Sequence, residues 1–527
     1  MRGRATAMIL VSAALGVTAC TAGSGVTTES SRVTTQGSAI PVSDSSVSSP
    51  DTPLDVPDST DPPGQELPIF EPEPFEWDAF DDQVDFATIE VPVDYSQPDG
   101  DRFELFVTRF RALDPDKRIG SLLVNPGGPG TGGSDFAIFA AQIYDQKILE
   151  HFDIIGWDPR GTGESDPPID CIDDYDPYFT AIDTTPKTDA ERDVLIETAE
   201  SFARECVAKN REIIQFVGTN NSARDMDVIR RALGEDTISY FGFSYGSELG
   251  AAWATLFPDT VRAAVLDGAS DPNAESIESS LQQMTGFENS VTTFLTKCSA
   301  DNTCLFHNGG DAEAAFAKLM DDLDENPIEG ATDRPRVNRD VALTAVVQAM
   351  YNQTFWPALE NALAAAQTGD GSGLLALHDT YYQRSFDGTY ANDLEAFQVI
   401  LCADTPDRPT VDEVDAEAVR YREVAPTLIP EDSLGGYFCT FFPESTDPRV
   451  TITGAGAGPI VVIGTTGDPA TPFDSTVRMS DTLEDGRLII VEADQHTGYD
   501  VNRCVIEAVN DYLINLEPPE DGLECGS

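Results

Sequence analysis

Short, nearly continuous apolar runs recur along this chain of 527 residues and predict the strands of a parallel sheet. Strands that are buried on both faces have this pattern in α/β proteins. Upstream of them, apolar and polar positions alternate around a Pro-Asp-Gly turn in residues 85–113, which predicts a β-hairpin. The runs are "IGSLLVN" (119–125), "FDIIGW" (152–157), "TISYFGF" (237–243), "RAAVLDG" (262–268), "GPIVVIG" (458–464) and "RLIIVEA" (487–493).

Helical periodicity fills the space between several of these runs and then takes over a long central segment. Residues 222–234 and 247–257 predict helices on either side of the third run. From about residue 271 to residue 443 the chain predicts successive amphipathic helices instead. Examples of these helices lie at 276–298, 311–323 and 342–351.

The length of the chain allows two or three domains. Because the strand pattern resumes at Gly458, the central helices read as an insertion into a single α/β domain. We therefore expect a catalytic domain made of residues 67–270 and 444–527, and a helical cap made of residues 271–443.

The N-terminal segment, "MRGRATAMILVSAALGVTAC", has a basic start, an apolar run and then small residues. Residues 1–20 are thus predicted to be a secretory signal peptide, too short to span a bilayer permanently. Residues 17–20 resemble a bacterial lipobox, which predicts lipidation of Cys20 and an anchor on the outer face of the cell membrane. Ordinary cleavage after Ala19, giving a secreted protein, is the alternative. Residues 21–66, rich in Ser, Thr and Pro, predict a disordered tether.

The formal net charge of −60 limits the kinds of partner that the protein is expected to bind. Phosphates would be repelled, so nucleic acid and anionic surfaces are not expected partners. Beyond Cys20 the chain has an even set of cysteines with no CxxC pair or Cys/His cluster, which favours disulfides over a metal site. Eight cysteines allow about 105 pairings; we expect neighbours along the chain to pair, and Cys504 to pair with Cys525. The cysteines are Cys171, Cys206, Cys298, Cys304, Cys402, Cys439, Cys504 and Cys525.

The stretch "GFSYG", residues 242–246, fits the G-x-S-x-G pattern of a nucleophile elbow. It follows a predicted strand and opens a predicted helix, which is the context that such an elbow needs. Ser244 is therefore the candidate nucleophile; a structural glycine-rich loop is the alternative. A serine hydroxyl is a poor nucleophile until a base takes its proton.

Histidines are scarce, which narrows the choice of that base. His151 precedes a strand, and His307 and His378 lie in the predicted insertion. Only His496 falls in a loop shortly after a late strand, the place expected for the base in the order Ser, acid, His. A lone surface histidine is the alternative.

The acid that orients the histidine has two candidates. Asp468 lies just after the run at 458–464, and Asp267 ends the run at 262–268. Chain order toward His496 favours Asp468. Thr471 and Pro472 are then expected to be the N-cap and first residue of a helix.

Acyl transfer also needs backbone N–H donors aimed at the developing oxyanion. The glycine-rich stretch "NPGGPG", residues 125–130, follows a predicted strand and is suited to this task. We assign one donor to Gly128, with Gly127 possible, and the other to Tyr245, the residue after the nucleophile. The charges of residues 158–163 are expected to brace their loop rather than to do chemistry.

Together these pieces resemble the peptidase branch of the α/β-hydrolase fold that holds proline iminopeptidases and secreted actinobacterial tripeptidyl aminopeptidases. Ser244, Asp468 and His496 match that family's triad. Pro126 replaces the histidine that usually opens the oxyanion loop of proline iminopeptidases, which favours the tripeptidyl branch. The resemblance runs from about Asp85 to Cys525 and rests on "VPVDYSQP", "NPGGPGTGG", "GWDPRGTGES", "GFSYGSELG", "LFPDTVRAAVLDG", "GDPATP", "HTGY" and the pair Cys402 and Cys439.

The resemblance implies a mostly parallel sheet of about eight strands flanked by helices, with a helical cap. It also implies an exported serine aminopeptidase that releases short peptides or residues from peptide N-termini, without a metal or organic cofactor. Cap carboxylates hold the substrate amine in such enzymes; Glu275, Glu278 and Asp404 are candidates, against the alternative of solvated surface carboxylates. An esterase or lipase with the same triad is the nearer alternative, and a non-catalytic peptide-binding lipoprotein is the more distant one.

Overall fold

The computed structural model of the protein describes residues 67–526, which fall within one compact unit. The predicted signal peptide, the lipidation site Cys20 and the predicted tether lie outside the described residues. Within the described residues, no helix combines the length and the apolar character that crossing a membrane requires.

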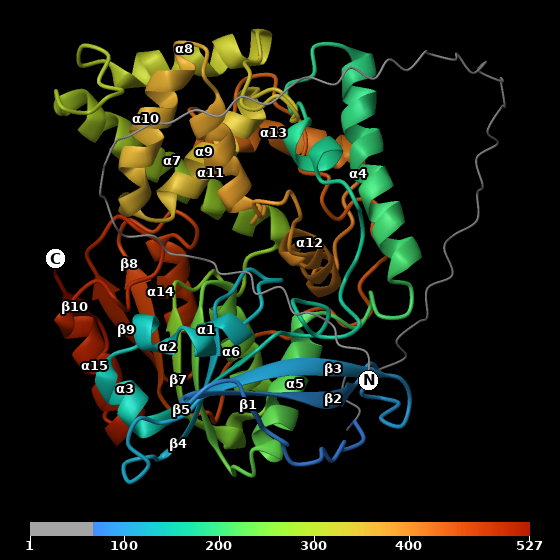
Figure 1. Ribbon diagram of the computed structural model, residues 1–527, viewed down its shortest axis with the longest axis vertical. Helices are drawn as coiled ribbons and strands as arrows, with labels where there is room; N and C mark the ends of the chain where they lie inside the picture. The colour runs from blue at the N-terminus through green and yellow to red at the C-terminus, as the bar shows by residue number, and fades with distance from the viewer. Residues whose placement is uncertain (1–66, 527) are drawn as a thin grey trace, which may run out of the picture. The chain divides into compact units, whose positions relative to one another are not determined.

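The described residues form one ten-stranded sheet in the order β1-β2-β3-β5-β4-β6-β7-β8-β9-β10 (Figure 1). Pairing is antiparallel from β1 to β5 across β2 and β3, and parallel from β5 to β10. The six apolar runs are thus the parallel strands that the sequence predicts, and residues 85–113 form the predicted hairpin. The strands are β1 (Asp78–Ala79), β2 (Val84–Pro92), β3 (Arg102–Phe110), β4 (Gly120–Asn125), β5 (Phe152–Trp157), β6 (Ile238–Phe243), β7 (Val261–Asp267), β8 (Ile460–Thr465), β9 (Gly486–Val491) and β10 (Leu523–Cys525).

The sheet has two more strands than the expected eight, and both are short strands at its edges, β1 and β10. In the middle of the sheet every residue of β4, β5 and β8 is buried, because helices cover both faces. Burial on both faces explains why these strands have no polar alternation in the sequence.

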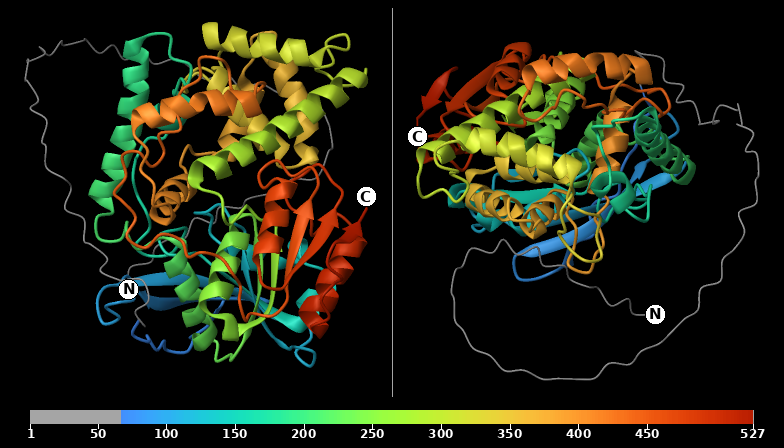
Figure 2. Two further views of the ribbon diagram at one scale, coloured as in Figure 1. Left: turned by 180° about the vertical axis from the view of Figure 1, so that it is seen from behind. Right: turned by 90° about the horizontal axis from the view of Figure 1, so that it is seen from above.

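Two hydrophobic cores lie on the two faces of the sheet, and a different set of helices covers each of them (Figures 1 and 2). One face is covered by α5 (Thr219–Ala232), α6 (Tyr245–Leu256) and α14 (Phe473–Thr482). The other is covered by α1 (Ser134–Ile138), α2 (Ala140–Ile143), α3 (Gln146–His151) and α15 (Arg503–Asn515). This layered arrangement is that of an α/β protein.

Between β7 and β8 the chain forms helices with a hydrophobic core of their own, as the sequence predicts for residues 271–443 (Figure 1). We refer to these residues as the helical insertion. Short helices are η1 (Asp176–Thr180) and η2 (Pro258–Thr260) before it and η3 (Gln353–Phe355) within it. The α-helices of the insertion are α7 (Ser276–Ala300), α8 (Ala312–Glu325), α9 (Arg339–Met350), α10 (Trp356–Ala366), α11 (Ser372–Tyr381), α12 (Asp393–Asp404) and α13 (Val411–Val424).

A long helix outside the insertion, α4 (Asp189–Lys209), lies beside it (Figure 1). Arg192 of α4 pairs with Asp415 of α13 at 2.6 Å, and Thr184 just before α4 bonds Asp340 of α9. Sequence patterning gave no sign of this contact, because ion pairs between segments so far apart leave no local periodicity. The division into a catalytic domain and a cap at residues 271–443 stays a prediction.

All eight cysteines after Cys20 form disulfides, and each pairs with its neighbour along the chain, as expected. Short covalent loops of this kind restrict the unfolded chain. Disulfides persist in oxidising compartments, so these four indicate an extracytoplasmic protein. The pairs are Cys171–Cys206, Cys298–Cys304, Cys402–Cys439 and Cys504–Cys525.

Candidate active site

Ser244 lies on the sharp turn between β6 and α6. Its φ of 54° and ψ of −126° are a strained backbone conformation for a residue with a side chain. The strain is held by a hydrogen bond from the Ser244 N–H to the Asp267 carbonyl, 2.8 Å. A Cβ on Gly242 would lie 2.2 Å from the Gly246 carbonyl oxygen, so this turn requires glycine there. The predicted strand, turn and helix around Ser244 are therefore all present.

His496 and Asp468 come together at the same edge of the sheet, in the loops after β9 and β8. The His496 Nδ1 lies 2.9 Å from each carboxylate oxygen of Asp468. Backbone N–H groups of Ala470, Thr471 and Thr497 also donate to this carboxylate, at 2.8–3.1 Å. Asp468 is buried, and these backbone donors hold its carboxylate in one orientation.

The surroundings of His496 suit it to accept a proton. Burial alone lowers the pKa of the imidazole, but the charge of Asp468 and its hydrogen bond outweigh burial and raise the pKa above 6.5. Since the Nδ1–H donates to Asp468, the proton-accepting atom is Nε2. Nε2 is buried and has no hydrogen-bond partner among residues 67–526. Tyr351 contacts both the backbone and the ring of His496. Its carbonyl accepts a hydrogen bond from the His496 backbone N–H at 2.9 Å, and its ring packs edge-on against the imidazole.

The end of β7 links Ser244 to His496. A Cβ on Gly268, the residue after Asp267, would lie 3.2 Å from the His496 Cε1. The Asp267 carbonyl accepts from Ser244, and its carboxylate accepts from the N–H groups of Gly498 and Tyr499 at 2.8 and 2.9 Å. Burial raises the pKa of Asp267 to about 7. The rival acid thus binds the backbone of the histidine loop, whereas Asp468 binds the imidazole.

Thr471 differs from its prediction. Helix α14 begins at Phe473, its N-cap is Pro472, and no side chain caps it. The Thr471 Oγ1 instead lies 3.3 Å from the His496 Nδ1. The prediction that Thr471 is only an N-cap is therefore wrong; proline supplies the extended entry, which frees the hydroxyl to contact the imidazole.

The glycine-rich loop at residues 125–130 lies against the nucleophile. A Cβ on Gly127 would come 2.9 Å from the Ser244 Cβ and 3.1 Å from the Tyr245 backbone nitrogen. Gly127 and Gly128 have φ values of 104° and 107°, which favour glycine. The Gly127 N–H already donates to the Asn125 side chain at 2.9 Å. Of the two glycines proposed as donors, Gly128 is thus the better candidate.

The charges of residues 158–163 lie within the fold, as expected for bracing groups. Asp158 accepts from the N–H groups of Ser134 and Glu164, and Arg160 is fully buried against Asp225 at 2.6 Å. A buried pair of this kind fixes the loop because neither charge can be left alone.

The three candidates for binding a substrate amine occupy different environments. Glu275 and Glu278 are both exposed at the start of α7, and Glu278 pairs with Arg420 at 3.0 Å. Asp404, at the end of α12, accepts two hydrogen bonds from Thr219. The contacts of these three side chains do not include Ser244, His496 or Asp468.

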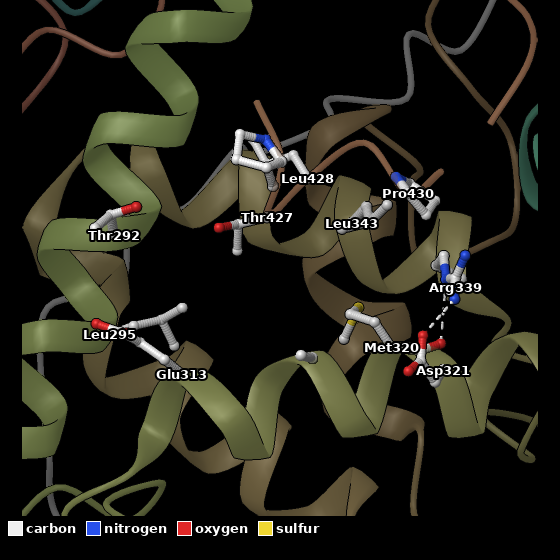
Figure 3. A pocket seen from close by; sticks show the side chains of 12 residues that line it. Thr292, Leu295, Glu313, Met320, Asp321, Arg339, Leu343, Thr427, Leu428 and Pro430 are labelled. Carbon is white, nitrogen blue, oxygen red and sulfur yellow. Dashed lines mark hydrogen bonds and ion pairs between the residues drawn. The ribbon is translucent and has the colours of Figure 1, made fainter. Parts of the chain in front are cut away.

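The described part of the chain offers few other places for a ligand. There, no group of three or more His, Cys, Asp or Glu side chains is arranged to hold a metal ion. A cavity of about 370 Å³ lies within the helical insertion, between α7, α8, α9 and residues 426–430 (Figure 3). Leu295 and Met320 line it, and Arg339 at its edge pairs with Asp321. Its lining contains no residue of the Ser244 and His496 cluster.

Comparison with known proteins gives consistent results. The model of the α/β-hydrolase fold family matches residues 120–502. Serine protease Hip1 of Mycobacterium tuberculosis is 36% identical over 452 residues, which cover 82% of this chain and 86% of that protein. Carboxylesterase B of the same species is 38% identical, covering 83% and 86%. Tripeptidyl aminopeptidase of Streptomyces lividans is 28% identical, covering 83% and 82%.

Proposed function

This chain belongs to the α/β-hydrolase fold family, and from that premise we propose that it is an extracytoplasmic serine aminopeptidase that releases short peptides from substrate N-termini. The observation that carries the proposal is the pair His496 and Asp468, whose Nδ1 contact leaves a buried Nε2 without a partner in the described residues. Ser244 lies on its strained turn beside the same strand end.

Each residue has a role in the proposed reaction. The His496 Nε2 takes the proton of the Ser244 hydroxyl, and the Ser244 Oγ attacks the substrate carbonyl. Asp468 holds the imidazole and stabilises its charged form. The N–H groups of Gly128 and Tyr245 bind the oxyanion. His496 then gives its proton to the leaving amine, and water hydrolyses the acyl-enzyme with His496 again as the base.

A peptide substrate is favoured by two of the relatives, one named a serine protease and one a tripeptidyl aminopeptidase. An esterase is the second candidate, because another relative is named carboxylesterase B and the same triad serves both reactions. A non-catalytic peptide-binding protein is disfavoured, since these relatives are named as enzymes.

We further propose that the chain is exported by the signal peptide at residues 1–20 and anchored through Cys20, with residues 21–66 as the tether. Secretion after ordinary cleavage is the alternative. The four disulfides support an extracytoplasmic place. The net charge of −60 supports peptide rather than nucleic acid partners. A lipid anchor predicts that detergent, but not salt, releases the protein from membranes. It also predicts that the Cys20→Ala variant is found in the medium.

The catalytic role of Ser244 is tested with Ser244→Ala in purified protein. If the triad acts as a unit, turnover falls about a million-fold. A fluorophosphonate probe should label the wild type at Ser244 and leave the variant unlabelled, because an unactivated serine does not react. Activity close to that of the wild type in purified Ser244→Ala protein would contradict the proposed mechanism.

The substrate class is tested by comparing three substrates: an unblocked tripeptide anilide, its N-blocked form and a short-chain acyl ester. Preference for the unblocked anilide supports the aminopeptidase, and preference for the ester supports the second candidate. A peptide-library digest followed by mass spectrometry, with Ser244→Ala as the control, then gives the number of residues released per cut.

A further inference from the structure

Asp404 is the last residue of α12, and its carboxylate reaches out of the helical insertion to the helix α5. Its two oxygens accept the N–H and the hydroxyl of Thr219, both at 2.6 Å. Thr219 is the first residue of α5 and is fully buried. The N-cap before it is Gly218, which has no side chain to cap the helix. Asp404 therefore supplies from the insertion the acceptor that the start of α5 lacks.

A second contact extends this link to the nucleophile turn. The Thr219 hydroxyl contacts the hydroxyl of Tyr245, the residue after Ser244. Burial raises the pKa of Asp404 to about 7, so its ionised form prevails above that pH. In that form the carboxylate only accepts, and the Thr219 hydroxyl, with one proton, donates to it. The chain therefore has one direction: Tyr245 donates to Thr219, and Thr219 donates to Asp404.

The backbone of Tyr245 carries one of the two proposed oxyanion donors. Tyr245 is the first residue of α6 and is 8% exposed, so its side chain is held inside the protein. The Gly127 side of the glycine-rich loop approaches the Tyr245 nitrogen closely, as described above. Because an oxyanion donor acts only at the correct distance, a shift of Tyr245 by a fraction of an ångström weakens it.

The other end of α12 touches the loop that carries the second proposed donor. A Cβ on Gly130 would lie 2.4 Å from the Asp393 carbonyl oxygen and 2.6 Å from the Phe397 nitrogen. The loop and the first turn of α12 are thus in direct backbone contact. Figure 1 shows α12 between the other helices of the insertion and the sheet. One helix of the insertion therefore contacts the loop of one proposed donor directly and reaches the residue of the other donor through Thr219.

We propose that Asp404 is a positioning residue for the oxyanion hole: through Thr219 it fixes Tyr245, so that α12 completes a site whose reacting groups lie on the sheet. This inference rests on the proposed function of Ser244 and deepens it. It assigns Asp404 a role other than binding the substrate amine, because the two hydrogen bonds that its oxygens accept come from Thr219 at the start of α5.

Three variants of nearly unchanged shape test the chain of hydroxyls: Asp404→Asn, Thr219→Val and Tyr245→Phe. In Asp404→Asn the amide must turn one donor toward Thr219, which reverses or breaks the chain. Each variant is assayed on an unblocked peptide anilide and on an acyl ester without an amine. A misplaced oxyanion donor lowers kcat by about tenfold to a hundredfold on both substrates, with KM changed by less than about twofold. The double variant Asp404→Asn with Tyr245→Phe should be no slower than the slower single variant.

Asp447→Asn is the matched control. Burial is the main cause of the raised pKa of Asp404, and the charge of Asp447 adds to it. Asp447 nevertheless binds Asn220 and Arg224 instead of Thr219. Its removal takes away a neighbouring carboxylate and should leave kcat unchanged on both substrates.

Several results would overturn the inference. A rise in KM for the unblocked anilide alone, with normal turnover of the ester, would assign Asp404 to the substrate amine. Wild-type kcat in all three variants would show that the chain has no effect on the reaction. If Asp404→Asn and Thr219→Val fail to fold by circular dichroism, Tyr245→Phe decides alone, since it removes a single oxygen. Failure of the wild type to label with fluorophosphonate is a different outcome, which rejects the proposed function itself.

Discussion

The ends of β7 and β8 each bring a buried aspartate to the same edge of the sheet, and the two aspartates bind different parts of the same loop. Asp468, after β8, contacts the imidazole of His496. Asp267, the last residue of β7, accepts from the backbone of the two residues at 498 and 499. Residue type, burial and position in the sheet are alike, so the role of each carboxylate depends on its partner.

The different partners of the two aspartates correspond to two requirements of a catalytic base: the orientation of its ring and the position of its loop. Asp468 sets the tautomer and the orientation of the ring, because the Nδ1–H donates to it. Asp267 sets where the loop lies, and its own carbonyl holds the Ser244 N–H at 2.8 Å. One residue thus fixes the direction of the base, and the other fixes the distance between the base and the proposed nucleophile.

The largest expected effect comes from Asp468→Asn. Both carboxylate oxygens accept hydrogen bonds, but the amide of asparagine has a single acceptor oxygen. Its NH2 group can therefore face the Nδ1 of His496, which favours the wrong tautomer of the imidazole, and the charged imidazole loses its counter-ion. We expect kcat to fall about ten-thousandfold, the scale seen when a triad acid becomes an amide. Steady-state kinetics measure the loss, and thermal unfolding checks that the fold is kept. A loss below about a hundredfold would mean that Asp468 does not orient the base.

Asp267→Asn should have a smaller effect on the rate and a clearer effect on stability. Its amide group can accept one of the two N–H groups but opposes the other with a donor of its own. We expect the free energy of unfolding to fall by about 1–3 kcal/mol, the cost of an unsatisfied buried group. The displaced loop should lower kcat by about tenfold to a hundredfold.

Urea unfolding and steady-state kinetics on the same preparation measure both quantities for Asp267→Asn. Asp153→Asn, a buried carboxylate that accepts from Ala112 and Arg118 elsewhere on the sheet, is the control for loss of a buried acceptor without change in the base. It should lose stability and keep its kcat. If Asp267→Asn were as slow as Asp468→Asn with unchanged stability, the division of roles between the two carboxylates would be wrong.

This pair of aspartates also shows which parts of the site can be predicted from the sequence and which cannot. The elbow at Ser244 was predictable because a strand, a turn and a helix follow one another locally. His496 was predictable because the chain has only four histidines and one of them follows a late strand. Chain order alone favours Asp468 over Asp267, since two strand ends at one sheet edge offer the same local pattern. Their catalytic roles remain predictions.

Contacts between distant segments could not be predicted. The Thr471 hydroxyl lies beside His496 because Pro472 is the N-cap of α14, whereas the sequence predicts Thr471 as the cap. The contact of Asp404 with Thr219 joins residues 185 positions apart. No periodicity or motif records such a pairing, because it depends on where the insertion packs. The same holds for α4 and its ion pair with α13.

The smallest expected effect concerns how stability depends on pH, and it isolates the burial of Asp267. Burial raises its pKa from 3.8 to about 7 in the folded protein. Between these values the folded state binds a proton that the unfolded state has released, so stability falls as pH rises through this window. Wild-type protein should therefore lose about 2–3 kcal/mol more than Asp267→Asn between pH 5 and pH 8.

Urea unfolding of both proteins at pH 5 and pH 8 measures this difference. The repulsion within an acidic chain and the other buried carboxylates, such as Asp158 with its pKa raised to about 6 by burial, affect both proteins equally and cancel in the comparison. Equal losses in the two proteins would mean that Asp267 keeps its charge in the folded state at pH 5. In that case its two backbone donors, rather than burial, would dominate its titration, and the loop of His496 would be held by a full charge throughout the working range of the enzyme.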